Sequence, residues 1–177
     1  EYGKFVDNNL PEYPQDQIIK LVGKINKKIK IGILSADLKN GHSITFFLKT
    51  ILLNYNKDEI EIYLFSNQID FKSVSKEITD LAFKTIDISK LSDFNAFNKI
   101  REFNLDLMID VMGYTSRNRI GLLKNRIAKK QALWMGYCNT TGLKNMDYII
   151  TDRNLIYENE KKFYSEKVLY LPEIWNT

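Results

Sequence analysis

Short runs of β-branched and apolar residues alternate with longer amphipathic segments along most of the chain. The run at residues 29–34 is followed by turn residues. In residues 44–54 apolar side chains then recur every three or four positions, which is the spacing of one helix face. The two patterns predict strands at residues 29–34, 60–65, 85–88, 105–111, 130–135, 148–150 and 168–171, and helices at residues 44–54, 72–82, 94–103 and 119–127.

This alternation predicts the fold class. Strands separated by helices are typical of βαβ units, in which consecutive strands run parallel. We therefore expect an α/β fold, a Rossmann-like, doubly wound and mostly parallel sheet, over residues 29–177. Residues 1–28 are polar, contain Pro11 and Pro14, and are interpreted as a lead-in segment with one possible helix at residues 16–22.

Composition narrows the class of protein. The 177 residues are 44% hydrophobic and 27% charged, as in ordinary globular domains. No apolar run approaches the ~20 residues of a membrane helix, and the first residues lack the features of a signal peptide. We expect a soluble, cytoplasmic protein with no membrane partner. Because the chain starts without Met, we also expect it to be a piece of a longer protein.

The absent motifs exclude several kinds of chemistry. Cys138 and His42 are the single cysteine and the single histidine, so a Cys/His metal centre with three or four protein ligands cannot form. Neither G-x-G-x-x-G nor G-x-x-x-x-G-K-[ST] occurs, so the glycines that cradle phosphates in dinucleotide and P-loop sites are missing. Hydride transfer and NTP hydrolysis therefore lose support.

Three loops follow strands whose carboxyl ends should meet at one edge of the sheet, where open parallel sheets bind ligands. The first loop carries Asp37 and His42, the second contains Thr115, and the third spans residues 136–142. His42 can act as a general base near neutral pH, but its spacing alone favours a loop or helix-cap histidine. Asp37 could likewise be catalytic, but alone it is better interpreted as a turn residue that bonds nearby amides.

The third loop has two interpretations of equal weight. Its glycines and hydroxyls can bind phosphate or sugar through side chains and backbone N–H groups, or they can form a plain turn after a strand. The residues concerned are Gly136, Thr140, Thr141 and Gly142.

Basic residues concentrate between positions 117 and 130. Such a cluster can contact nucleic-acid phosphates, but the interleaved aromatic residues of a single-strand platform are absent. A solvated helix face is the better interpretation, and a nucleic-acid partner is not expected. The cluster consists of Arg117, Arg119, Lys124, Arg126, Lys129 and Lys130.

Sequence motifs run through the three loops in a fixed order. They are S-A-D at residues 35–37 with H-S-I at 42–44, L-M-I-D-V-M-G-Y-T at 107–115, Q-A-L-W-M-G-Y at 131–137, T-T-G at 140–142, M-D-Y at 146–148 and Y-S-E-K at 164–167. In this order they resemble the catalytic region of the O-linked N-acetylglucosamine transferase family, of the bacterial type, which also has a SPINDLY branch. The resemblance covers about residues 29–172.

The resemblance implies a GT-B glycosyltransferase with two Rossmann-like lobes and the active site between them. This chain is similar to the first lobe, and residues 1–28 to the lead-in that follows tetratricopeptide repeats. The family's second lobe makes most contacts to the sugar nucleotide and is not in this chain. We therefore expect the chain to need that lobe and those repeats as partners, and to be inactive alone.

The resemblance also implies roles for individual residues. His42 is expected to contact the acceptor or donor and is the candidate base, and Asp37 is expected to bind the substrate or donor. Thr115, with residues 136–142 including Tyr137, is expected to line the sugar pocket, while Asp147 and Tyr148 support that loop from behind. The implied reaction is an inverting transfer, with UDP-N-acetylglucosamine as substrate, to a Ser or Thr of a protein or peptide. No metal or cofactor is implied.

Some positions depart from the family pattern. Cys138 and Asn139 stand where the family has Pro-Gly, residues 126–129 read R-I-A-K in place of R-P-A-P, and one extra residue lies between Asp37 and His42. The SPINDLY branch uses the same scaffold for fucose. The resemblance therefore defines the class of enzyme better than the sugar.

Two other functions remain open beside the glycosyltransferase. The alternative is a non-catalytic Rossmann-like nucleotide- or sugar-binding domain, and a nucleic-acid-binding domain is a remote third.

Overall fold

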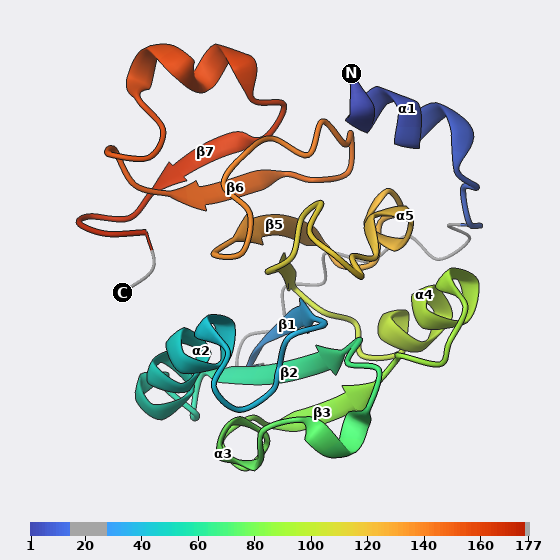
Figure 1. Ribbon diagram of the computed structural model, residues 1–177, viewed down its shortest axis with the longest axis vertical. Helices are drawn as coiled ribbons and strands as arrows, with labels where there is room; N and C mark the ends of the chain where they lie inside the picture. The colour runs from blue at the N-terminus through green and yellow to red at the C-terminus, as the bar shows by residue number, and fades with distance from the viewer. Residues whose placement is uncertain (15–27, 176–177) are drawn as a thin grey trace.

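The computed structural model describes residues 1–14 and 28–175. Within them, one sheet has the strand order β3-β2-β1-β4-β5-β6-β7, and all neighbouring strands are parallel (Figure 1). This confirms the predicted α/β, Rossmann-like fold class. The strands are β1 (Ile29–Ser35), β2 (Ile60–Ser66), β3 (Lys84–Asp87), β4 (Leu107–Asp110), β5 (Lys130–Trp134), β6 (Tyr148–Thr151) and β7 (Lys167–Tyr170).

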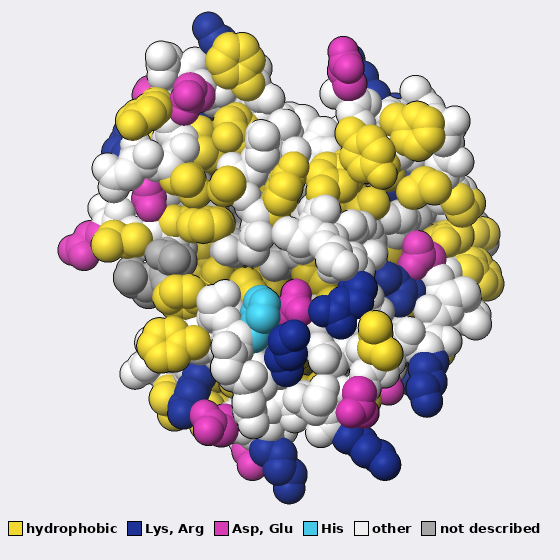
Figure 2. Space-filling model, in the orientation of Figure 1, with side chains coloured by type: hydrophobic (Ala, Val, Ile, Leu, Met, Phe, Trp, Pro, Cys, Tyr) yellow, Lys and Arg dark blue, Asp and Glu magenta, His cyan; other side chains and the backbone are white. Residues whose placement is uncertain are grey.

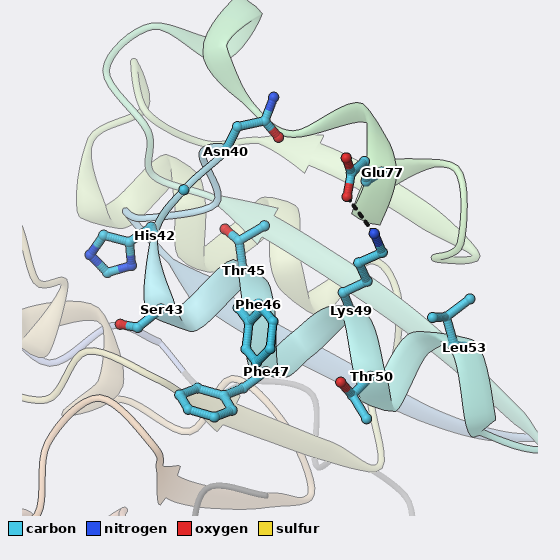
Figure 3. Close-up of a pocket in the computed structure, with 11 residues that line it drawn as sticks. Asn40, His42, Ser43, Thr45, Phe46, Phe47, Lys49, Thr50, Leu53 and Glu77 are labelled. Carbon is cyan, nitrogen blue, oxygen red and sulfur yellow. Dashed lines mark hydrogen bonds and ion pairs between the residues drawn. The ribbon is translucent and has the colours of Figure 1, made fainter.

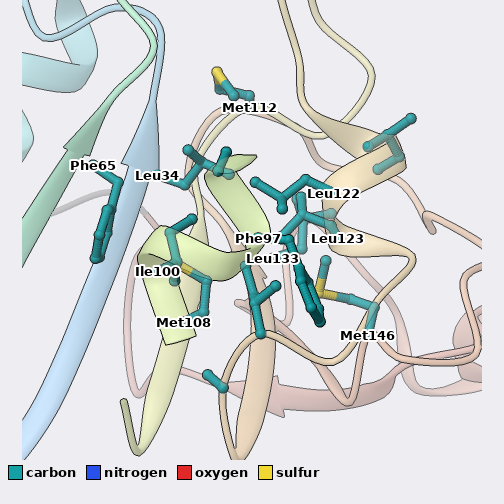
Figure 4. Close-up of a cluster of buried hydrophobic side chains, with 14 of the residues drawn as sticks. Leu34, Phe65, Phe97, Ile100, Met108, Met112, Leu122, Leu123, Leu133 and Met146 are labelled. Carbon is teal, nitrogen blue, oxygen red and sulfur yellow. The ribbon is translucent and has the colours of Figure 1, made fainter. Parts of the chain in front are cut away.

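Two hydrophobic layers separate the sheet from the helices. Side chains alternate along β1, so Ile33 joins the layer under α2 (Ser43–Asn54) and α3 (Lys76–Thr79), whereas Leu34 joins the opposite layer. That second layer lies under α4 (Asp93–Arg101), α5 (Ile120–Leu123) and α1 (Tyr2–Asn9). Figure 4 shows its centre, where Phe97 and Ile100 of α4 meet Leu34, Met108 and Leu133 of the sheet.

The predicted helix at residues 72–82 is wrong in its extent. A 3-10 turn at Phe71–Ser73 and the short α3 replace it, because the chain between them is extended. There Val74 pairs with Lys39 in an isolated antiparallel bridge, and the Ser75 N–H donates to the Leu38 carbonyl at 2.7 Å. Tertiary hydrogen bonds to the loop after β1 therefore interrupt the helical pattern.

The predicted helix at residues 119–127 shortens to the single turn of α5. The helix does not continue to residue 127, because the Ile127 N–H donates to the Gln131 side-chain oxygen Oε1 at 2.8 Å. In the lead-in, the structure adds α1, which the sequence analysis did not predict. The possible helix at residues 16–22 lies outside the described residues.

The loops after β1 and β4 leave the sheet at its switch point. β1 and β4 are neighbours, but β1 is followed along the chain by β2 on one side, and β4 by β5 on the other. Connections from these strands therefore diverge and leave a crevice above their carboxyl ends. β5 is the next neighbour of β4, so all three candidate loops open at this edge, as predicted.

A buried carboxyl group shapes the turn after β4. Asp110 is fully buried, and its two carboxylate oxygens accept the N–H groups of Met112 at 3.1 Å and Gly113 at 2.8 Å. Burial raises the pKa of Asp110 to about 7, although the two backbone hydrogen bonds favour the charged form. The group therefore changes charge near neutral pH inside the fold.

The third loop leaves β5 through a glycine in close contact with the residue that follows β4. A Cβ atom on Gly136 would lie 1.8 Å from the Val111 carbonyl oxygen, and 3.4 Å from Cδ1 of Ile44 in α2. Only a residue without Cβ fits between these neighbours. Gly136 therefore determines how near the third loop approaches the other two.

Asp110 should make stability depend on pH. Between the unfolded pKa near 4 and the folded pKa of about 7, the unfolded state releases a proton that the folded state keeps, so stability falls as pH rises through this window. The slope is at most about 1.4 kcal/mol per pH unit. Urea unfolding at pH 5, 6, 7 and 8 should show this fall in wild type and not in Asp110→Asn; parallel profiles would contradict it.

Replacing Gly136 should damage the strand ends. Gly136→Ala forces the Val111 carbonyl after β4 or the backbone after β5 to move, and we expect a loss of about 1–3 kcal/mol in the free energy of unfolding. Gly41→Asn is the matched control, because a Cβ there meets nothing within 4 Å and Asn tolerates the positive φ of 76°. Equal urea midpoints for the two variants would argue against the close contact.

Candidate active site

Three side chains from two loops meet in the crevice at the switch point. Asp37, after β1, forms an ion pair with Arg117, from the segment after β4, with 2.9 Å between Oδ1 and Nη2. His42 lies beside them, with its Nε2 3.9 Å from the same Asp37 oxygen. Figure 2 shows the histidine next to acidic and basic side chains in the middle of one face of the molecule. All three side chains are partly exposed.

His42 is both a helix cap and a site residue. It is the N-cap of α2, and its Nδ1 accepts the Ile44 N–H at 3.3 Å. In the neutral ring this hydrogen bond places the proton on Nε2, the nitrogen that faces Asp37. A distance of 3.9 Å is too long for a hydrogen bond between them. The Nε2 proton is therefore free to be donated to a ligand oxygen.

Arg117 is held in a strained conformation. Its φ of 60° is rare for a residue with a side chain, and its carbonyl accepts from the Asn67 Nδ2 at 2.8 Å. Asn67 follows β2, so a third strand end fixes the backbone that aims Arg117 at Asp37. The sequence analysis missed this role, because Arg117 was grouped with the other basic residues.

The start of the third loop packs on the second. Gly113, with a φ of 54°, lies against the Tyr137 ring, where a Cβ would come within 2.5 Å. Tyr137 in turn makes an edge contact with Tyr114, with 5.7 Å between ring centroids. Gly136 and Tyr137 are thus beside the second loop, as the shared-edge prediction requires.

Glu166 holds the end of the third loop. This buried carboxylate accepts the Thr141 N–H at 2.7 Å, the Thr141 hydroxyl, and the Thr140 hydroxyl at 2.7 Å. Both threonine side chains are therefore engaged within the protein. Their binding to a ligand stays a prediction, and the backbone N–H groups of Thr141 and Gly142 are also hydrogen-bonded within the loop and to Glu166. Glu166 was visible in the sequence only as part of the Y-S-E-K motif.

The lead-in helix α1 covers the same loop. Gly3 touches Gly142, since a Cβ on Gly3 would lie 2.2 Å from the Thr141 carbonyl oxygen. That carbonyl also accepts the Tyr114 hydroxyl at 2.6 Å. Burial, followed by the nearby Tyr137, raises the pKa of Tyr114 to about 12, so its hydroxyl remains a donor. The lead-in is therefore part of the site's framework.

Thr115 and Asp147 take different positions. Thr115 is exposed after β4, and its hydroxyl donates to the Met112 carbonyl at 2.8 Å. Its contact with a sugar stays a prediction.

Asp147 does not stand behind the third loop; it precedes β6 and accepts the Gln131 N–H at 2.8 Å near the amino end of β5. The pKa of Asp147 is lowered, because hydrogen bonds, chiefly from Arg126, outweigh its burial.

The interpretation of the basic cluster as a solvated helix face is wrong. Arg119 pairs with Asp93 at 2.6 Å, and Lys129 with Asp106 at 2.6 Å. Arg126 pairs with Asp147 and Lys124 is buried against α1, where it donates to the Asp7 carbonyl at 2.6 Å. Most of these cations join parts of the fold, which leaves little free positive charge for nucleic-acid phosphates.

The described residues contain neither a membrane-spanning helix nor a cluster of metal ligands. No helix among them is both long and apolar enough to cross a membrane. In the same part of the chain, His, Cys, Asp and Glu side chains do not gather in threes that could hold a metal ion.

Known proteins share this sequence pattern. The family model "Glycosyl transferase family 41" matches residues 9–176. A tomato protein named as a probable UDP-N-acetylglucosamine–peptide N-acetylglucosaminyltransferase SPINDLY is 29% identical over 150 residues, which are 82% of this chain and 16% of that protein. The rice protein of the same name is 26% identical over 177 residues, or 98% of this chain and 19% of its own length. The chain thus spans less than a fifth of these relatives.

A solved structure shares the fold. An O-GlcNAc transferase mutant of Thermobaculum terrenum superposes with a TM-score of 0.80 at 23% identity, over 85% of this chain and 29% of the other. At this identity the likeness shows the fold alone, a Rossmann-like sheet with helices on both faces. The family match covers nearly the whole chain and includes all three loops of the site. This chain belongs to glycosyl transferase family 41.

Proposed function

We propose that this chain is the N-terminal, acceptor-side lobe of an inverting protein O-glycosyltransferase. The reaction moves N-acetylglucosamine from UDP-N-acetylglucosamine to a Ser or Thr hydroxyl of a protein. The family match over residues 9–176 carries the proposal. It is supported by the names of the relatives, which describe UDP-N-acetylglucosamine–peptide transferases, and by the cluster of Asp37, His42 and Arg117 at the switch point of the sheet.

The remaining parts of the enzyme belong to the same proposal. The relatives are more than five times longer than the matched segment, which leaves room for a second lobe and for tetratricopeptide repeats. In a two-lobe enzyme the crevice of this lobe would face the second, which would hold the diphosphate of the donor. A bacterial type and a cytoplasmic location stay predictions.

The geometry suggests what His42 does in this reaction. The acceptor oxygen forms a bond to the anomeric carbon, the bond from that carbon to the diphosphate breaks with its electron pair leaving on the diphosphate, and the hydroxyl proton passes to water. A base at Nε2 would need a lone pair there. The Ile44 N–H donates to Nδ1, so in the neutral imidazole the proton is on Nε2. We therefore assign His42 to hydrogen-bond donation, which holds a substrate oxygen in line, rather than to proton removal.

Asp37 and Arg117 would keep the His42 ring in place. Asp37 faces the Nε2 side of the ring, its backbone carbonyl accepts the Thr45 hydroxyl of α2 at 3.1 Å, and Arg117 neutralises its charge. A lone carboxylate beside the crevice would repel a diphosphate donor, whereas the ion pair does not. The pair therefore suits an anionic sugar nucleotide.

Two substitutions of His42 separate capping from catalysis. Asn is a good N-cap and Ala is a poor one, so His42→Asn should unfold like wild type, whereas His42→Ala should lose part of the cap stabilisation of about 1 kcal/mol. Both remove the imidazole, so both should lower transfer by about 100-fold or more. The measurement is transfer to a mixed peptide pool by the full-length protein, offered UDP-N-acetylglucosamine or GDP-fucose.

The outcomes identify the donor and the role of His42. Loss of transfer with donor binding intact, measured by calorimetry, supports the proposal. Turnover of GDP-fucose alone would keep the class and correct the sugar. Wild-type activity in His42→Asn would remove His42 from the reaction. If wild type binds neither nucleotide, the chain is a Rossmann-like domain without this activity.

A further inference from the structure

Helix α2 is apolar on both of its faces. Its inner face buries Ile44, Leu48 and Leu52 against the sheet, as an amphipathic helix should. Its outer face exposes Phe46 and Leu53, with exposed fractions of 70% and 57%. An apolar outer face on a surface helix marks a contact with another molecule or segment.

The outer face borders a pocket that starts at the candidate active site. The pocket measures about 710 Å³, within the range of sites that bind small groups. Figure 3 shows His42 at one end of the row of side chains and Leu53 at the other, with Phe46 between them. The lining residues are Asn40, Gly41, His42, Ser43, Thr45, Phe46, Phe47, Lys49, Thr50, Leu53 and Glu77.

The charges in the pocket cancel. Lys49 and Glu77 pair with each other at 2.6 Å, and the other lining groups apart from His42 are apolar or neutral polar side chains. A charged occupant would have to break this pair, whereas an uncharged apolar side chain would not. The pocket is also too small for a domain surface and suits one or two side chains.

The distance along α2 gives the spacing of such an occupant. Ser43 and Leu53 are ten residues apart, which is about 15 Å along a helix that rises ~1.5 Å per residue. An extended polypeptide covers about 3.3 Å per residue. A chain that places one residue at His42 therefore places another beside Leu53 about four or five positions away.

We propose that the pocket on α2 binds an apolar side chain of the acceptor polypeptide, about four or five residues from the Ser or Thr that receives the sugar. The inference rests on the proposed function, because it takes His42 as the point where the acceptor hydroxyl lies. It adds a specificity element: the enzyme reads an uncharged, apolar residue at a set distance from the modified hydroxyl.

The test uses the full-length protein and a peptide library with one Ser. A single Leu is scanned through the positions on both sides of the Ser, and the reference peptide has Ala in its place. Wild type should prefer Leu over Ala about four or five positions from the Ser, with roughly a tenfold higher kcat/KM. In Leu53→Ala, and in Phe46→Ala, whose ring lies between His42 and Leu53, this ratio should fall toward one.

Phe163→Ala is the matched control. Phe163 is 69% exposed, close to the 70% of Phe46, but it lies on the 3-10 helix Glu158–Phe163 and does not line the pocket. The control should keep the wild-type preference. Because both phenylalanines are largely exposed, neither variant should unfold, which thermal melting can verify.

Several outcomes would overturn the inference. The inference is wrong if wild type shows no preference for Leu at any position. It is also wrong if Phe46→Ala keeps the wild-type preference. An equal loss of kcat/KM for the Leu and Ala peptides would assign Phe46 to a contact with another part of the enzyme. Transfer without any Leu preference rejects only this inference, whereas absence of transfer by wild type rejects the proposed function as well.

Discussion

The site depends on the turn that Asp110 makes at the end of β4. Its buried carboxyl group binds the N–H groups of Met112 and Gly113, so the chain bends directly above the switch point. The other contacts of the edge start from this bend. Met112 Sδ accepts the Ala36 N–H of the first loop at 2.9 Å, and Gly113 receives the Tyr137 ring of the third. One desolvated carboxyl group thus sets the positions of three loops.

Close packing at this edge places strain beside the candidate chemistry. Arg117 and Met135 adopt positive φ values of 60° and 74°, and both lie on segments that reach the crevice. Such conformations persist only where neighbours enforce them. For Arg117 the neighbours are Asn67 and Asp37, which hold its carbonyl and its guanidinium. The strain therefore accompanies an arginine that is aimed at one point in the site.

The lead-in and the basic residues act as connections between parts of the fold. Lys124 is buried under α1, and Gly3 of α1 contacts Gly142, so the first residues of the chain stabilise the third loop. α2 has a similar double role, because one face belongs to the core and the other borders the pocket beside His42. A change in either helix can therefore act on the site through packing alone.

The sequence by itself determined the parallel α/β fold, the shared edge of the three loops, and the family. Alternating apolar runs and ordered motifs are local features, and they need no tertiary information. It did not determine α1, the break near Ser75, or the partners of Arg117 and Glu166. Those depend on residues distant in sequence: Ser75 bonds Leu38, and Glu166 bonds Thr141. Only the tertiary structure decided them, because hydrogen bonds and burial across the fold outweigh the local preferences of the chain.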